Sequence, residues 1–111
     1  MNNYIEIEID NNDTEYTIKM RYNDYIKVFS GKVNVNTTFD KTALLGTIDA
    51  LQRLKRFDIP IIVHVKSDYM LEVINNSKDI DEYIEIWKEF FYLLNQIPTI
   101  CFTKLKWIKD V

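Results

Sequence analysis

Residues 33–57 read VNVNTTFDKTALLGTIDALQRLKRF, and this segment carries the strongest helix signal in the chain. Its large apolar residues recur at spacings of three and four, so an α-helix would gather them on one broad stripe. The stripe consists of Leu44, Leu45, Ile48, Leu51, Leu54 and Phe57. We therefore expect a long helix with one apolar face, and we expect the rest of the domain to be arranged around it.

Both ends of this helix carry residues suited to helix termini. Thr37 and Thr38 are candidate N-caps, because a threonine hydroxyl accepts a hydrogen bond from a free N–H of the first turn. Asp40 suits the positive end of the helix dipole, and Lys55 and Arg56 fall in the expected last turn, where cations are favoured. The pattern therefore predicts a helix that continues to the end of the segment.

Two alternating segments precede the helix. In residues 4–10 isoleucines alternate with acidic side chains, and in residues 15–22 aromatic and aliphatic side chains alternate with polar ones. This period of two predicts two strands, each with a buried and a solvated face, joined into a hairpin by the polar turn at residues 11–13. Several registers keep apolar residues opposite each other, and charge pairing favours the one that places Glu6 across from Lys19.

The rest of the chain alternates between strand and helix patterns. The predicted elements are strands at 25–30 (ended by Gly31), 59–65 and 99–105, a short helix capped by Ser67, and a helix over 77–95. The order is therefore β-β-β-α-β-α-α-β. It implies a single α/β domain over residues 1–111, with a mixed five-stranded sheet whose fourth and fifth strands are parallel neighbours. The tail at 106–111 is too short for a further helix of consequence.

The composition indicates one acidic domain. With 111 residues, 47% of them hydrophobic, the chain can build a single core. Its net charge of -3 argues against general nucleic-acid binding, which requires a basic surface. The first ten residues lack a signal-peptide pattern, and no segment reaches the roughly 18 apolar residues of a membrane span. Because Cys101 is the single cysteine, we expect no internal disulfide, which favours a reducing compartment. Together these features predict a cytoplasmic protein without a membrane partner.

Several short motifs, in the right order along the chain, resemble those of the ribonuclease H family. They are Ser30-Gly31, then Thr37-Thr38-Phe39-Asp40-Lys41-Thr42-Ala43-Leu44 at the helix start, Ala50-Leu51 and Leu54-Lys55 within it, Lys66-Ser67-Asp68-Tyr69-Met70 after the fourth strand, Trp87, and the last strand from Ile100 to Lys106. The match covers nearly the whole chain. It implies a ribonuclease H-like fold that lacks the family's C-terminal helix, because the chain ends at Val111.

The resemblance also implies where the family's catalytic carboxylates would stand. In that family four carboxylates hold two divalent metal ions, which stabilise the attacking and the leaving oxygen. Asp10 matches the first carboxylate, Ala43 stands at the second position and Lys66 at the third, and the fourth belongs to the absent terminal helix. Alanine offers no ligand, and lysine brings a cation to the place of a metal ion. We therefore expect a non-catalytic domain with no metal and no cofactor.

The alternative is a divergent metal-dependent nuclease or an RNA–DNA hybrid-binding protein. It would combine Asp10 with a rearranged carboxylate set drawn from Glu8, Asp40 or Asp68. Glu6, Glu8 and Asp10 share one strand face and form a candidate metal cluster, although a solvated sheet face paired with cations gives the same pattern. A nucleic-acid-binding module without catalysis is a third interpretation, and the charge balance argues against it.

The chain's lone histidine and lone cysteine favour structural roles. His64 lies in the fourth predicted strand, and no Cys, Asp or second His stands at ligand spacing from it. We therefore predict no zinc site and expect His64 to be a hydrogen-bonded residue of the strand. Cys101 lies in the last predicted strand, and we expect it to be a small buried hydrophobe.

Protein binding is the function that these observations favour. The acidic side chains of the 77–95 helix form either a solvated face or a surface that imitates a nucleic-acid backbone and occupies a basic groove on a partner. This set comprises Asp79, Asp81, Glu82, Glu85 and Glu89. Tyr25, Phe29 and Ile62 are expected to lie uncovered on the sheet face of the acidic strand residues, as a docking or homodimer surface. The Ile-, Asn-, Lys- and Tyr-rich composition is typical of AT-rich coding, which favours an inhibitor or accessory factor from a phage or another mobile element.

Overall fold

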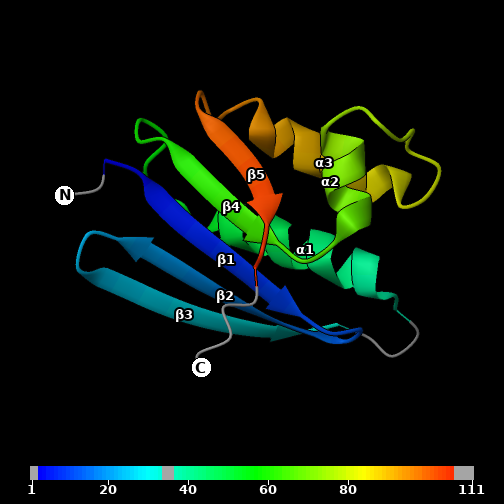
Figure 1. The fold of residues 1–111 in the computed structure, drawn as a ribbon, viewed down its shortest axis with the longest axis horizontal. Helices are drawn as coiled ribbons and strands as arrows, with labels where there is room; N and C mark the ends of the chain where they lie inside the picture. The colour runs from blue at the N-terminus through cyan, green and yellow to red at the C-terminus, as the bar shows by residue number, and fades with distance from the viewer. Residues whose placement is uncertain (1–2, 34–36, 107–111) are drawn as a thin grey trace.

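The computed structural model describes residues 3–33 and 37–106, which form a five-stranded sheet and three helices (Figure 1). The elements are β1 (Ile5–Asn11), β2 (Glu15–Tyr22), β3 (Tyr25–Lys32), α1 (Phe39–Gln52), β4 (Ile61–Val65), α2 (Asp68–Ile74), α3 (Ile84–Leu94) and β5 (Ile100–Lys104). The sheet order is β3-β2-β1-β4-β5; β1 pairs antiparallel with β2 and β2 with β3, whereas β4 runs parallel to both β1 and β5. The predicted element order and mixed five-stranded sheet are therefore confirmed. No helix among the described residues is long and apolar enough to cross a membrane.

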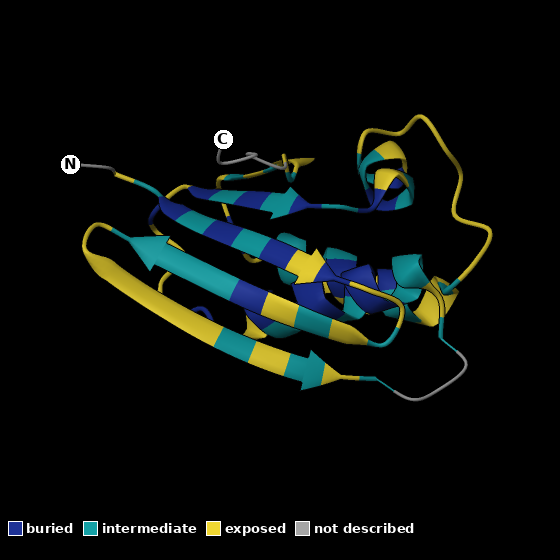
Figure 2. Cartoon of the chain, turned by 60° about the horizontal axis from the view of Figure 1, so that its bottom comes forward, coloured by how far each residue is buried: buried dark blue, intermediate teal, exposed yellow. Residues whose placement is uncertain are grey.

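The helices cover one face of the sheet and bury its apolar side chains (Figure 2). α1 packs on β1 and β2, α2 on β5, and α3 on α1. Alternation along β1 points its isoleucines to this side, where Ile7 and Ile9 are fully buried. From α3, the fully buried Phe90 ring contacts that of Phe102 in β5, which joins the third helix to the sheet. We call the opposite side, against which no helix of the described residues packs, the open face.

α1 begins as predicted and ends earlier than predicted. Its N-cap is Thr38, whose hydroxyl accepts a hydrogen bond from a first-turn N–H. At the other end, the N–H groups of Arg53 and Leu54 each bond to a carbonyl three residues back, so the last turn tightens and the chain leaves the helix. Leu54 then reaches the core from outside the helix. The prediction that Lys55 and Arg56 lie in the last helical turn is therefore wrong.

The helix predicted over residues 77–95 is also shorter, because α3 covers only its later part. Tyr83, just before α3, has a φ of 58°, a left-handed backbone that a right-handed helix does not contain. The Tyr83 hydroxyl shares a hydrogen bond with Thr38, and its ring meets that of Tyr69 edge-on, with the centroids 6.2 Å apart. These contacts fix where the chain enters α3, so the residues between α2 and α3 form a non-helical connection.

The hairpin register differs by two residues from the one that charge pairing favoured. Glu6 lies across from Arg21, and Glu8 lies across from Lys19. The turn explains this register, because the side-chain oxygen of Asn12 accepts hydrogen bonds from the N–H groups two and three residues farther on. β3 also continues past the glycine that was expected to end it, and β4 begins later than predicted.

Candidate functional site

Asp10 and Lys66 meet where the two central parallel strands end. Asp10 is near the end of β1 on the open face, and Lys66 directly follows β4. The pairing of Ile9 with Val65 brings the next residue of each strand side by side, and the Lys66 Nζ lies 2.6 Å from the Asp10 Oδ1. The lysine side chain is 18% exposed and the aspartate side chain 58%. A lysine whose side chain is largely buried is therefore ion-paired with this carboxylate.

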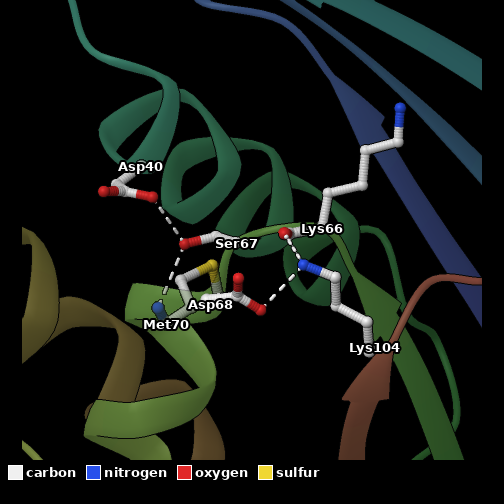
Figure 3. Close-up of polar contacts among 6 residues, drawn as sticks. All are labelled: Asp40, Lys66, Ser67, Asp68, Met70 and Lys104. Atoms are coloured by element: carbon white, nitrogen blue, oxygen red, sulfur yellow. Dashed lines mark hydrogen bonds and ion pairs between the residues drawn. The ribbon is translucent and has the colours of Figure 1, made fainter.

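Further polar contacts lie next to this pair, around the Lys66 main chain and the start of α2 (Figure 3). The Lys104 Nζ donates to the Lys66 carbonyl and to the Asp68 carboxylate, each at 2.7 Å. Ser67, the predicted N-cap of α2, accepts a hydrogen bond from a backbone N–H of that helix, and its Oγ donates to the Asp40 carboxylate at 2.8 Å. Two of the three carboxylates that a rearranged nuclease centre could recruit, Asp40 and Asp68, are thus held by a hydroxyl and an ammonium group.

The side chains at this site do not fit the two-metal centre of a ribonuclease H. Ala43 is fully buried in α1 and offers no ligand atom. The Lys66 ammonium group lies next to Asp10 and is positively charged. Divalent ions at this place would instead require negatively charged oxygen ligands. Within residues 3–33 and 37–106, no three His, Cys, Asp or Glu side chains gather as a metal site requires. Of the three implied positions that lie within the described residues, Asp10 carries a carboxylate, and the Lys66 cation lies against it.

Glu6 forms a second polar cluster on the open face. Its carboxylate lies 2.9 Å from the His64 Nε2 and 3.6 Å from an Arg21 nitrogen. His64 is therefore a hydrogen-bonded strand residue, as predicted, and this end of the acidic row on β1 pairs with basic side chains. Cys101 lies across from Ile62 on the same face and is exposed. The prediction that Cys101 is buried is wrong, because β5 is an edge strand and no described helix covers this side of it.

Tyr25 and Phe29 do not lie on the open face, contrary to the prediction. Phe29 lies across from the fully buried Ile18 in β2, and cross-strand partners share a face, so both aromatic residues point to the helix side. The apolar residues that β3 does present on the open face are Ile26 and Val28, which are 52% and 60% exposed. The error arises from the phase of β3, because the tight turn before Tyr25 decides which alternate residues turn inward.

On the helix side, Tyr25 and Phe29 line a groove of about 710 Å³ between the β2–β3 hairpin and the α1–β4 connection. Arg53, Lys55 and Arg56 line its other wall. Nothing in the sequence predicts this groove directly, because its two walls lie far apart along the chain and meet only in the fold. The available signal was the cluster of three cations within residues 53–56, two of which, Lys55 and Arg56, were interpreted as a favourable helix end.

The five acidic residues of the 77–95 segment do not lie on one helix face. Asp79, Asp81 and Glu82 belong to the connection before α3, whereas Glu85 and Glu89 lie on α3 itself. All five are exposed. Next to them is a groove of about 530 Å³, lined mainly by apolar side chains of α3. The expected acidic helix is therefore an acidic surface shared by a loop and a helix, with an apolar groove beside it.

Comparison with known proteins places the fold. No family model matches the chain, and no curated protein matches it in sequence. Among solved structures, the chain is similar to LC11-RNase H1, whose crystal structure is of a complex with an RNA/DNA hybrid. The match has a TM-score of 0.78 at 15% sequence identity and covers 91% of this chain and 84% of the other. The strand order, the three helices and this likeness together show that the chain has a ribonuclease H-like fold.

Proposed function

We propose that this chain is a non-catalytic ribonuclease H-like domain that acts by binding a protein partner. The observation that carries the absence of catalysis is the Lys66 ammonium, 2.6 Å from Asp10. Even two unit charges of like sign repel by about 4 kcal/mol at a separation of about 4 Å near a protein surface. A divalent ion and this ammonium group would therefore exclude each other, and the buried Ala43 supplies no ligand to compensate.

Surface properties support the choice of a protein as the partner. The core is complete without the family's metal-binding carboxylates, so the fold can serve as a scaffold. Two apolar grooves, one beside β3 and one on α3, are open to solvent, and such surface is typical of interaction sites. The net charge of -3 disfavours general attraction to nucleic acid. A protein ligand is the partner class that suits these properties.

Incubation with an RNA–DNA hybrid tests the absence of catalysis. The purified chain is mixed with labelled hybrid and either Mg²⁺ or Mn²⁺, and an active ribonuclease H serves as the positive control. We expect no cleavage above the protein-free control. Metal-dependent cleavage by the chain that disappears in Asp10→Asn would contradict the proposal and favour the alternative, a divergent nuclease centred on Asp10. Stable binding of intact hybrid without cleavage would instead identify a hybrid-binding protein.

Affinity capture with matched charge variants tests the partner class. Wild-type bait is compared with a loop variant, in which Asp79, Asp81 and Glu82 become Asn, Asn and Gln, and with a groove variant, Lys27→Glu with Lys55→Glu. All five positions are exposed, so both variants should fold. We expect a protein that wild type retains after nuclease treatment and that one of the two variants loses. Retention that nuclease treatment abolishes for every bait would contradict protein binding and support nucleic-acid binding.

A further inference from the structure

The groove on the helix side of β3 exists because α1 is too short to cover the end of the hairpin. α1 packs on β1 and β2, and β3 is the most exposed strand of the sheet (Figure 2). The connection after α1 then forms the second wall of the groove. Its lining consists of Ile5, Met20, Arg21, Tyr22, Tyr25, Lys27, Phe29, Gln52, Arg53, Leu54, Lys55, Arg56 and Ile59. The groove holds about 710 Å³, enough for a few side chains of a bound segment.

The charges around this groove are all of one sign. Four side chains of the lining are cationic on this face, Lys27, Arg53, Lys55 and Arg56, and no lining residue is Asp or Glu, in a chain whose net charge is -3. Arg21 also lines the groove, but its guanidinium pairs with Glu6 on the open face. The three arginines pair with carboxylates that stand outside the lining, for example Arg56 with Asp58 at 2.8 Å. Within the described residues, the two lysines, Lys27 and Lys55, form no ion pair with a carboxylate. The rim therefore offers two ammonium groups to an anionic ligand.

The inner part of the groove is apolar and held in place. Ile5, Leu54 and Ile59 are each less than 10% exposed, so they form a fixed aliphatic base. The Arg53 guanidinium lies 4.1 Å from the centroid of the Phe29 ring, and Arg53 is itself bound to a carboxylate of α1. Tyr25 stands at the rim with 75% of its surface exposed. A ligand would thus find an apolar base that accepts a side chain, below a rim of cations.

We propose that this groove binds an acidic segment of a protein partner, with one apolar side chain seated in the base and flanking carboxylates paired to Lys27 and Lys55. The inference rests on the proposed function, because it names the chemistry of the partner. Single-stranded nucleic acid is disfavoured by the same geometry, since bases bind by stacking on open aromatic faces. The bottom of this groove is aliphatic, and the Arg53 guanidinium covers one face of Phe29. Tyr25 is then the one aromatic residue of the lining that is exposed, whereas successive bases of a strand would each need an aromatic face.

A labelled peptide tests this proposal directly. The probe is a decapeptide of Asp and Glu with a central Leu-Phe pair, and binding is measured by fluorescence anisotropy. We expect saturable binding that weakens at least about tenfold in Lys27→Glu with Lys55→Glu, because two favourable pairs become repulsive. The matched control, Lys78→Glu with Lys106→Glu, makes the same change of charge at exposed positions outside both grooves and should weaken binding less than about threefold. Tyr25→Ala, at an exposed rim position, should weaken it severalfold with the thermal midpoint unchanged.

Three results would overturn the proposal. Equal weakening in the groove variant and the control variant would show that only overall charge is sensed. Equal binding of a peptide with Ser in place of Leu-Phe would show that the apolar base is not used. Tighter binding of an oligothymidine, with competition between the two ligands, would assign the groove to nucleic acid. Cleavage of hybrid by the chain would refute the proposed function and leave peptide binding standing, so the two failures remain distinguishable.

Discussion

The two faces of β1 differ in what they contribute to the molecule. On the helix side, Ile5, Ile7 and Ile9 are each at most 9% exposed and are part of the core. On the open face, the alternate residues are acidic, and two of them, Glu6 and Asp10, pair with basic side chains in partial contact with solvent. Burial of apolar surface dominates folding, whereas exposed ion pairs contribute little. The comparison indicates that the fold depends on the covered face and that side chains of the open face can change without loss of the fold.

Substitution of adjacent residues in β1 gives the largest expected difference between the faces. Ile7→Ala should lower the free energy of unfolding by about 2–5 kcal/mol, because it leaves a cavity in a fully buried position. Glu8→Ala, one residue away on the open face, should change it by less than about 0.5 kcal/mol. Urea denaturation measures both values. If Ile7→Ala does not fold, Ile7→Val should still cost about 0.5–1.5 kcal/mol. Equal costs at Ile7 and Glu8 would refute the comparison.

The next effect concerns Tyr16, whose ring packs against both glycines of the chain. A Cβ at Gly46 would lie 2.9 Å from the Tyr16 Cγ, and a Cβ at Gly31 would lie closer still to the tip of the ring. In a helix interior Ala is normally favoured over Gly by about 0.5–1 kcal/mol. Here we expect Gly46→Ala to cost about 1–3 kcal/mol, because the ring must shift near its attachment to the strand.

Thermal or urea unfolding in two backgrounds checks this expectation. In Tyr16→Ala the contact is absent, so the added Gly46→Ala should be neutral or stabilising, in line with helix propensity. A cost that is the same in both backgrounds would show that the ring is not the cause.

Alkaline pH should produce a smaller effect at the same residue. Burial first, and then the hydrogen bond of the Tyr16 hydroxyl to Asp49 and the charge of that carboxylate, raise the pKa of Tyr16 to about 12. The neutral hydroxyl is thus favoured in the folded state. Its stabilising contribution is complete below about pH 10, the pKa of the unfolded residue, and is lost as the pH rises through the folded-state value.

A difference measurement isolates this contribution from the other tyrosines. We expect the unfolding free energy of wild type to fall by about 1 kcal/mol more than that of Tyr16→Phe as the pH rises from about 10 to 12. This difference in unfolding free energy is smaller than the pKa shift of Tyr16 would give in full, because the partly buried ring remains partly screened by solvent. Parallel pH profiles for the two proteins would show that Tyr16 ionises as an exposed tyrosine does.

The sequence predicted the features that depend on local periodicity and missed those that depend on distant contacts. The alternation in β1 correctly placed Ile7 and Ile9 in the core, and Thr38 was correctly expected as a helix cap. The start of α3 was missed, because Tyr83 adopts a left-handed backbone within contacts to other elements. At the candidate site, the resemblance singled out Asp10 and Lys66 separately, and the structure shows that their side chains pair. That this pair occupies the place of a metal centre stays a prediction.

For the same reason, the sequence did not predict the groove beside β3 with its rim of cations. The phase of β3 depends on a tight turn and on the hairpin register, so the prediction from local alternation placed Phe29 on the wrong face of the sheet. The cations after α1 were attributed to its last turn, because nothing local marks the end of the helix at Arg53. Only the folded arrangement brings these two segments to one site.

The smallest expected effect is the coupling between Glu6 and Arg21 on the open face. Their charged atoms are 3.6 Å apart, and the side chains are 27% and 39% exposed. A double-mutant cycle with Glu6→Gln and Arg21→Gln should give a coupling of about 0.2–1 kcal/mol, and near 1 M salt it should fall toward zero. Because the Glu6→Gln change also weakens the contact with His64, only the cycle separates the arginine term. A coupling above about 2 kcal/mol that persists in high salt would mean that polar contacts of the open face hold the sheet together as the buried isoleucines do. In that case side chains of the open face could not change without a structural cost, and the contrast between the two faces of β1 would no longer hold.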